Sequence, residues 1–297
     1  MKTAVCSTIY PAMMPYLSPF LQSVVSQTDA DFDFWLGLDG IDAAELESFR
    51  EKYPVSCISS ANETIAGFRS RFLAQICDSY DAVILVDSDD ILLPDRVRAA
   101  KQALQTYDTY ACALRLIDQA GIDLDHCFNY HGPGNWDVEL SRMNMFGFSN
   151  SAFRSDVLSR CLRIPDNVVL VDWLVISLAV ASGAELCFDD TARMLYRQHS
   201  SNTAVTLPPF CPEQIVRATT LVEDHYKTLA ALLSQREPDN SSFSDQIVLR
   251  QRDIGRFRVF IEDANGLADY VGRINSLQNS FCWWEMIAHP ALESLWR

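Results

Sequence analysis

The hydrophobic pattern of the first half of the chain predicts strands alternating with helices. The strand-like runs are short and apolar, and they comprise residues 3–9, 32–38, 55–58, 82–86 and 110–117. Between them apolar residues recur at helical spacing, as at Ile65, Phe68, Phe72 and Ile76. Strands joined through helices require right-handed crossovers, so this order predicts an α/β fold with a mostly parallel sheet flanked by helices.

The pattern changes twice in the second half. Residues 121–150 show no regular period, and a loop of that length in a compact domain is usually functional. A helix is predicted over 172–182 and a strand over 185–188. After three prolines at 208, 209 and 212 the pattern is helical, roughly over 214–234, 245–264 and a last stretch ending at Trp296. We therefore predict an α/β domain over 1–205 and a helical C-terminal region over 206–297.

Charge and cysteine usage narrow the classes of function. The formal net charge of −15 comes without any run of Lys or Arg, which argues against nucleic acid as a partner. Nine cysteines, scattered and never spaced as Cys-x-x-Cys, argue against a disulfide framework and are typical of a cytoplasmic protein. No apolar run reaches the roughly 20 residues of a membrane span, and no secretory signal is expected.

The candidate chemistry begins directly after the apolar run 82–86, at Asp87-Ser88-Asp89-Asp90. Ligands of parallel α/β sheets gather at the carboxyl ends of strands, so these carboxylates are expected where a metal ion and a phosphate meet. Mg²⁺ and Mn²⁺ favour such hard oxygen ligands and usually share them with substrate phosphates. Short acidic turns are also common as solvated loops, so this motif alone leaves both interpretations open.

The order of several motifs resembles the family 2 glycosyltransferases of GT-A fold over roughly residues 3–203. Asp39-Gly40 stands where the family has an acidic turn, and Arg71 precedes Asp87 by 16 residues. The stretch from Val86 to Asp90 matches the metal motif of the family, Asp-x-Asp. Asp172-Trp173 is similar to the acidic pair that supplies the base, and Tyr196-Arg197-Gln198-His199 follows.

This resemblance implies a metal-dependent transfer of a sugar from a nucleotide diphosphate sugar, with a UDP-sugar favoured, to a saccharide or other acceptor hydroxyl. Asp172 would act as general base, with inversion at the sugar carbon. Asp89 and His199 would bind Mn²⁺ or Mg²⁺. The residues implied for donor binding are Tyr10, Asp39, Arg71, Asp87 and Ser88.

The sequence also departs from the family pattern. Val171 stands where an acidic residue usually precedes the base, and Phe72 replaces an Asn that often follows the arginine. Asp172 is also suited to the first turn of a helix, where the dipole favours a carboxylate. His199 as a structural histidine and Arg71 as a surface arginine are further open interpretations. If Asp172 is not the base, the candidates are Asp166, Asp137 and Glu139.

Two other functions remain as alternatives. A non-catalytic protein that binds nucleotide sugars would share the pocket and lack turnover. A sugar-phosphate nucleotidyltransferase would ordinarily carry a basic, glycine-rich loop after the first strand, and residues 7–12 contain no Gly, Lys or Arg. In the C-terminal region the aromatic residues suit core packing better than a membrane or partner surface, and the helices there are candidates for homo-oligomer formation. Those aromatic residues are Phe281, Trp283, Trp284 and Trp296.

Overall fold

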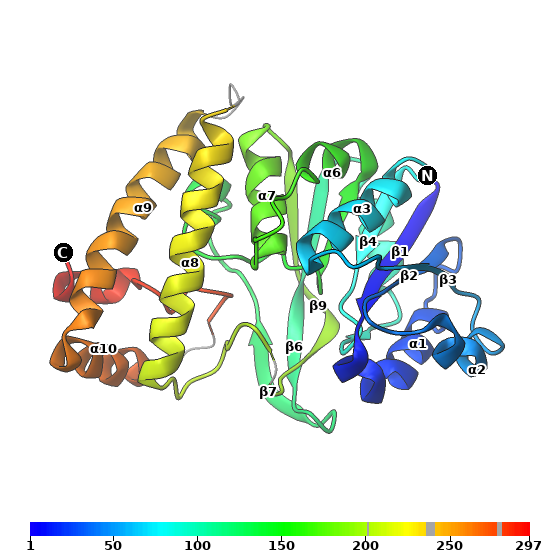
Figure 1. Cartoon of the computed structure of the whole chain (residues 1–297), viewed down its shortest axis with the longest axis horizontal. Helices are drawn as coiled ribbons and strands as arrows, with labels where there is room; N and C mark the ends of the chain where they lie inside the picture. The colour runs from blue at the N-terminus through cyan, green and yellow to red at the C-terminus, as the bar shows by residue number, and fades with distance from the viewer. Residues whose placement is uncertain (201, 236–240, 278–280) are drawn as a thin grey trace. The chain divides into compact units, whose positions relative to one another are not determined.

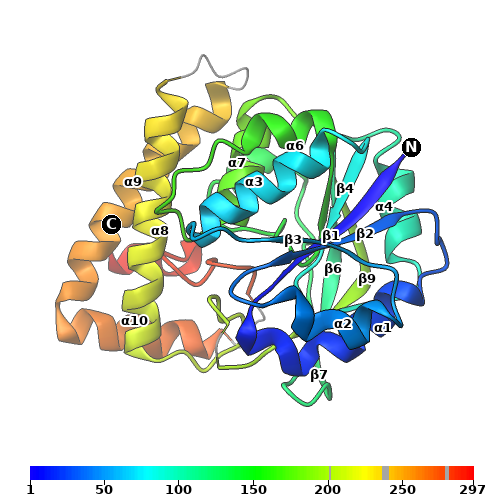
Figure 2. The ribbon, with the colours of Figure 1, turned by 45° about the vertical axis from the view of Figure 1, so that its right-hand side comes forward.

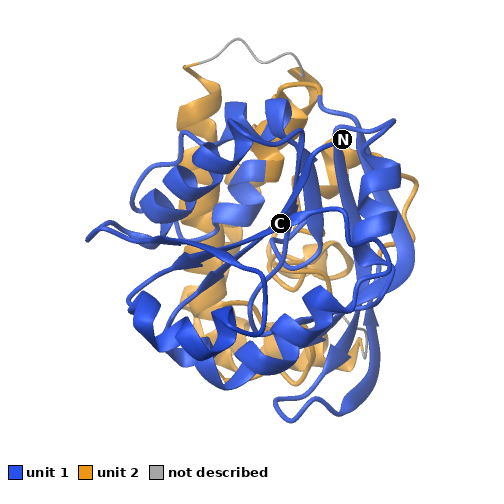
Figure 3. Cartoon of the chain, turned by 90° about the vertical axis from the view of Figure 1, so that its right-hand side faces the viewer, with its two compact units in different colours: residues 1–129, 146–175, 184–197 blue, residues 130–145, 176–183, 198–297 orange. Residues whose placement is uncertain are grey.

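The computed structural model describes residues 1–200, 202–235, 241–277 and 281–297. The chain divides into two compact units, coloured separately in Figure 3. The first unit comprises 1–129, 146–175 and 184–197, and the second comprises 130–145, 176–183 and 198–297. The predicted boundary near residue 205 stays a prediction, because the second unit also takes two segments from the earlier part of the chain.

One nine-stranded sheet forms the centre of the first unit among the described residues. The strands are β1 (Thr3–Ile9), β2 (Asp33–Leu38), β3 (Ser56–Ser59), β4 (Ala82–Leu85), β5 (Ile91–Leu92), β6 (Thr109–Ile117), β7 (Asp123–Phe128), β8 (Ser151–Arg154) and β9 (Leu186–Arg197). Their order is β3-β2-β1-β4-β8-β6-β9-β5, and β7 pairs with β6. All four residues of β4 are buried, as a continuous apolar run requires when both faces of a strand are covered.

Helices cover both faces of this sheet, as Figures 1 and 2 show. The helices of the first unit are α1 (Leu17–Val25), α2 (Glu47–Arg50), α3 (Ile65–Cys77), α4 (Arg96–Ala103) and α6 (Ser155–Cys161), with 3-10 turns at Pro11–Tyr16 and Ala43–Leu46. α3 and α6 lie on one face, and α4 lies on the other (Figure 2). Thr64 begins α3 by accepting a hydrogen bond from the Gly67 amide. These layers confirm the predicted α/β fold with helices flanking the sheet.

Three features of the sheet differ from the prediction. β8 lies between β4 and β6 and is antiparallel to both, so the sheet is parallel from β3 to β4 and mixed beyond. Residues 121–150, predicted as one long loop, include β7 and the short helix α5 (Trp136–Glu139). β9 runs to Arg197 instead of ending near 188, because it pairs with β6 along that whole length. Tertiary pairing, rather than a local pattern, extends this strand.

The second unit contains three long helices, α8 (Pro212–Leu233), α9 (Ser241–Glu262) and α10 (Ala264–Ser276), followed by a 3-10 turn at Pro290–Leu295. α8 and α9 pack side by side, and α10 crosses one of their ends (Figure 1). α7 (Val171–Ala181) begins in the first unit and ends in the second. The four aromatic residues of the C-terminal stretch are at most 6% exposed, which confirms their prediction as core. The predicted helical C-terminal region is thus present.

Two predictions from composition can be compared with the structure. All nine cysteines are free thiols, in agreement with the absence of a disulfide framework. Within the described ranges, no helix combines the length and apolar character that a membrane crossing requires.

Candidate active site

The carboxyl ends of three parallel strands bring the first group of predicted residues together. β1 pairs with β2 up to Ile9 and Leu38, so Tyr10 and Asp39 follow at one edge of the sheet. The Asp39 amide donates to the Ile9 carbonyl at 2.9 Å. On the other side β1 pairs with β4 up to Leu85, and Asp87 follows two residues later. The sheet topology therefore gathers these three side chains, as ligand sites of open α/β sheets require.

The turn after β4 is held from behind by hydrogen bonds. Ser88, only 2% exposed, donates from Oγ to the Thr8 carbonyl at 2.9 Å. Asp90 is fully buried, and its Oδ1 accepts from the Arg197 amide at 2.8 Å. The Arg197 Nε donates to the Asp89 carbonyl at 2.8 Å. Ser88 and Asp90 thus anchor the turn, and Asp87 and Asp89 are its partly buried carboxylates.

Asp87 and Asp89 repel each other electrostatically. Burial raises the pKa of Asp87, and the charge of Asp89 raises it further. Arg69 opposes this shift, and Ser149 donates from Oγ to Asp87 Oδ2 at 2.7 Å. Two carboxylates that interact this strongly are a favourable place for a divalent cation, which would relieve their repulsion.

The arginine beside these carboxylates is Arg69 rather than the predicted Arg71. The Arg71 Nε bonds both carboxylate oxygens of Glu63, at 3.0 and 3.1 Å, and its Nη2 donates to the Ser59 carbonyl. The Arg69 guanidinium lies over the Phe148 ring, 5.6 Å from its centre, and lowers the pKa of Asp87. Arg71 is therefore paired with Glu63, whereas Arg69 acts electrostatically on Asp87.

Helical periodicity could have identified Arg69. The buried residues of α3 include Ala66, Phe72 and Leu73, and Arg69 lies three residues from the first two and four from the third. Arg71 falls away from this stripe. Ser149 gave no such signal, because it lies in the irregular segment before β8, where neither spacing nor pattern distinguishes one serine from another.

Asp172 is the second residue of α7 and is partly buried in the first unit. Burial raises its pKa to about 6, and the charge of Asp87 contributes, while Arg69 and the Trp173 amide oppose the shift. It occupies the first helical turn, as its alternative interpretation predicted, and it also interacts electrostatically with the acidic turn after β4. A carboxylate with its pKa near neutrality is suited to proton transfer.

The remaining predicted residues lie at the margins of this group. Ser60 donates from Oγ to Asp39 Oδ1 at 3.2 Å, and Gly40 has the positive φ of 69° that the turn after β2 needs. Tyr10 is 38% exposed, and its pKa is raised by burial and by Asp89 and Asp87. It therefore lies near the carboxylates with its ring still accessible.

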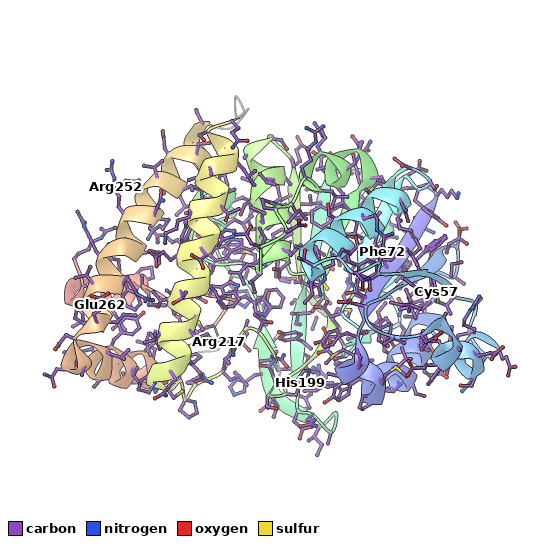
Figure 4. The ribbon with its side chains drawn as sticks, viewed as in Figure 1. Cys57, Phe72, His199, Arg217, Arg252 and Glu262 are labelled. Carbon is purple, nitrogen blue, oxygen red and sulfur yellow. The ribbon has the colours of Figure 1, made fainter. Side chains whose placement is uncertain are left out.

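His199 belongs to the second unit and is labelled in Figure 4. Its backbone amide donates to Asn202 Oδ1 at 3.0 Å, and its carbonyl accepts from the Asn202 amide. Its assignment as a metal ligand stays a prediction. In the described part of the chain no group of three or more His, Cys, Asp or Glu side chains forms a complete metal site.

Comparison with known proteins gives one curated relative and many solved structures. The dTDP-rhamnosyl transferase RfbG of Shigella flexneri is 26% identical over 208 residues, which are 61% of this chain and 68% of RfbG. No protein-family model matches the chain. The 208-residue match shows that this chain is similar in sequence to a glycosyltransferase.

The solved structures share the fold. A TarS fragment of S. aureus, residues 1–349, aligns with a TM-score of 0.58 at 14% identity, covering 86% of this chain and 71% of the fragment. The same fragment in complex with UDP-GlcNAc aligns with a TM-score of 0.56. The mannosyltransferase PcManGT of Pyrobaculum calidifontis, in complex with GDP-Man and Mn²⁺, aligns at 0.60 and 12% identity, covering 94% of this chain and 76% of that one. This chain has a fold of GT-A type, and its sequence is similar to that of a glycosyltransferase, so it resembles the family 2 glycosyltransferases.

Proposed function

We propose that the first unit binds a nucleotide diphosphate sugar at the ends of β1, β2 and β4, and that Asp172 deprotonates the acceptor hydroxyl. The observation that carries this proposal is the electrostatic coupling of Asp172 to Asp87 and Arg69 within that unit. Their proximity brings a potential base to the acidic turn where the diphosphate is expected.

The residues around the turn fit a divalent cation bound together with the donor. Asp87 and Asp89 approach closely enough for each other's charge to matter, and neither side chain is fully buried. Two carboxylates are a typical protein contribution to Mg²⁺ or Mn²⁺ when substrate phosphates complete the coordination. When bound, the cation offsets charge on the diphosphate leaving group. We assign Asp87 and Asp89 to hold it.

Donor recognition is assigned to side chains around this turn. Asp39 and Tyr10 follow adjacent strands and are placed to contact the nucleoside. Arg69 is the cation that opposes the carboxylates, so we assign it a diphosphate contact. Ser88 supports the turn through its bond to the Thr8 carbonyl. Arg71, engaged with Glu63, has the weaker case.

The proposed reaction is a single displacement with inversion. The acceptor oxygen attacks the anomeric carbon as the Asp172 carboxylate takes its proton, and the bond to the nucleotide diphosphate breaks. Asp172 bears a negative charge above its pKa of about 6, so it can accept this proton at neutral pH. One base suffices for this chemistry.

We also propose that the region after residue 205 selects the acceptor or mediates self-association.

Donor identity is the most direct test. The relatives are named for dTDP-rhamnose, UDP-GlcNAc and GDP-Man, and the donor favoured here is a UDP-sugar. Thermal unfolding with UDP-, dTDP- and GDP-sugars, each with Mn²⁺ or EDTA, identifies the donor, because a ligand of the native state raises the melting temperature. Hydrolysis of the stabilising donor is then measured. Stabilisation by a nucleotide sugar with no hydrolysis or transfer would favour the non-catalytic alternative.

A further inference from the structure

A cavity of about 220 Å³ lies within the second unit, separate from the residues assigned above. It is enclosed by α8, α9, the segment that follows α5 and residues 285–290. Ligand sites for drug-sized molecules are usually about 300–1,000 Å³, so this volume suits one small ring rather than an extended chain.

Part of the cavity lining is apolar. The apolar residues in the lining are Met143, Ile254, Ile287, Ala288 and Pro290. Tyr226 is also in the lining. Its hydroxyl donates to the Ser141 carbonyl at 2.5 Å, so the hydrogen of this hydroxyl is already used. Such a wall can cover the C–H face of a small molecule, but it offers no hydrogen bonds.

The lining also contains two arginines, Arg142 and Arg250, with unused donors. Arg250 is 8% exposed and Arg142 is partly buried. The Nε atom of each is buried and finds no acceptor among the described residues. Leaving a buried donor unsatisfied costs about 1–3 kcal/mol, so water or a ligand is expected to accept from these atoms.

Carboxylates balance the two arginines. Arg250 donates from Nη1 to Asp253 Oδ2 at 3.2 Å, and Arg297 donates to the same oxygen at 2.7 Å. Glu139 and Glu285 also line the cavity, and neither forms an ion pair with Arg142 within the described ranges. The lining therefore presents separate donors and acceptors with nearly equal formal charge. An anion would be repelled by the glutamates, and a cation would be repelled by the arginines.

We propose that this cavity binds one neutral sugar ring of a glycan, with its hydroxyl groups accepting from Arg142 and Arg250 and donating to Glu139 and Glu285. The choice of a sugar among neutral polyols rests on the proposed glycosyltransferase function. The cavity, the orphan donors and the charge balance do not depend on it. Through this site the second unit would bind the acceptor glycan or the finished product.

The test is saturation-transfer NMR of the full chain with a panel of methyl glycosides of common hexoses and 6-deoxyhexoses. We expect saturable binding of at least one glycoside, and UDP should not displace it. Arg142→Met keeps most of the side-chain volume and removes the donors, so affinity should fall by about tenfold or more. The matched control is Arg217→Met on α8, an exposed residue labelled in Figure 4, which should bind normally.

Folding of each variant is checked by thermal unfolding. If Arg142→Met does not fold, Glu139→Gln tests the acceptor side of the same cavity. Absence of binding by every glycoside, or binding unchanged in the cavity variant, overturns the proposal. Arg142-dependent binding of inorganic phosphate in place of a glycoside also overturns it. Titration with UDP separates the two hypotheses, because loss of nucleotide binding with glycoside binding intact would refute only the proposed function.

Discussion

Replacement of Asp172 by Asn separates its possible roles, because Asn has nearly the same size but cannot accept the acceptor proton. Positioned general bases typically contribute about 10²-fold to 10⁴-fold to a rate. We therefore expect transfer to the acceptor to fall by that range with saturating donor and acceptor. Donor affinity should change little, because the proposed donor contacts come from other side chains.

The pH dependence of the wild-type transfer rate gives a second quantitative test of Asp172 as the base. With a pKa of about 6, Asp172 is about nine-tenths ionised at pH 7 and about one-tenth at pH 5. The ionised fraction, and with it the rate of transfer, should therefore fall by up to about tenfold between these two values. A bound divalent cation favours the ionised carboxylate and should move the midpoint to lower pH. The Asn variant should lack this titration.

Stability gives an independent check in metal-free protein. The folded-state pKa of about 6 lies above the usual 3.8, so the folded protein binds more protons between these values and gains stability as pH falls through 6. Each pKa unit corresponds to about 1.4 kcal/mol, so the ionised carboxylate costs at most about 3 kcal/mol at pH 7. Its favourable place in the first turn of α7 offsets about 0.3–1 kcal/mol. Asp172→Asn should thus unfold at a higher temperature than wild type at pH 7, and the gain should shrink toward pH 4.

The assay measures nucleotide release and product formation with the donor found by thermal unfolding, in parallel for Asp172→Asn and Asp166→Asn. Asp166 is exposed, and its Oδ1 accepts from Thr64 Oγ1 at 3.4 Å, so its variant is a matched control with an expected normal rate. Near-wild-type turnover of Asp172→Asn would refute the assignment of the base. A rate lost in Asp166→Asn instead would move the base to that residue.

Three further predictions concern the donor site and the second unit. Asp89→Ala should abolish the metal-dependent part of donor binding in calorimetry, and wild-type affinity that is undiminished by EDTA would contradict the metal assignment. Arg69→Met should weaken donor binding by about tenfold or more, while Arg71→Met should have a small effect; the reverse order would restore the assignment from sequence. Truncation after residue 205 removes most of the second unit but leaves its residues 130–145 and 176–183, so the melting temperature should fall while the folded fraction retains donor binding. Complete loss of donor binding in a folded truncated protein would contradict the assignment of donor binding to the first unit.

The order of elements could be predicted because burial is periodic in the sequence. The run Ala82–Leu85 became a strand buried at every residue. In α3 the predicted positions Phe68, Phe72 and Ile76 are buried, but Ile65 at the first position of the helix is 60% exposed. The direction of β8 could not be predicted. Its four residues, Ser151–Arg154, have no period of their own, and their antiparallel place between β4 and β6 depends on pairing with distant segments.

The site was predicted where the chemistry follows directly from a strand end. Asp87 and Asp89 needed only the position of β4, because ligand sites gather at such ends. Choosing between Arg69 and Arg71 required knowing which face of α3 points toward the acidic turn. Two residues apart on a helix, their side chains point in directions that differ by about 200°. Ser149 needed the path of an irregular segment that approaches Asp87 from 62 residues away. Local sequence patterns indicate where a strand ends. They do not give the orientation of a helix or the path of an irregular segment.

The electrostatics of the site explain how so acidic a chain can hold a nucleotide diphosphate. Asp87 interacts electrostatically with both Asp89 and Asp172, and Arg69 is a cation that opposes the pKa shifts of Asp87 and Asp172. Without further positive charge, a diphosphate would meet more like charge than opposite charge. Burial raises the pKa values of Asp87 and Asp172, and the neighbouring carboxylates raise them further in the metal-free protein. A divalent cation that binds together with the donor would lower both pKa values at once, so donor binding should release protons near pH 6, and calorimetry in buffers of different ionisation enthalpy would detect that release.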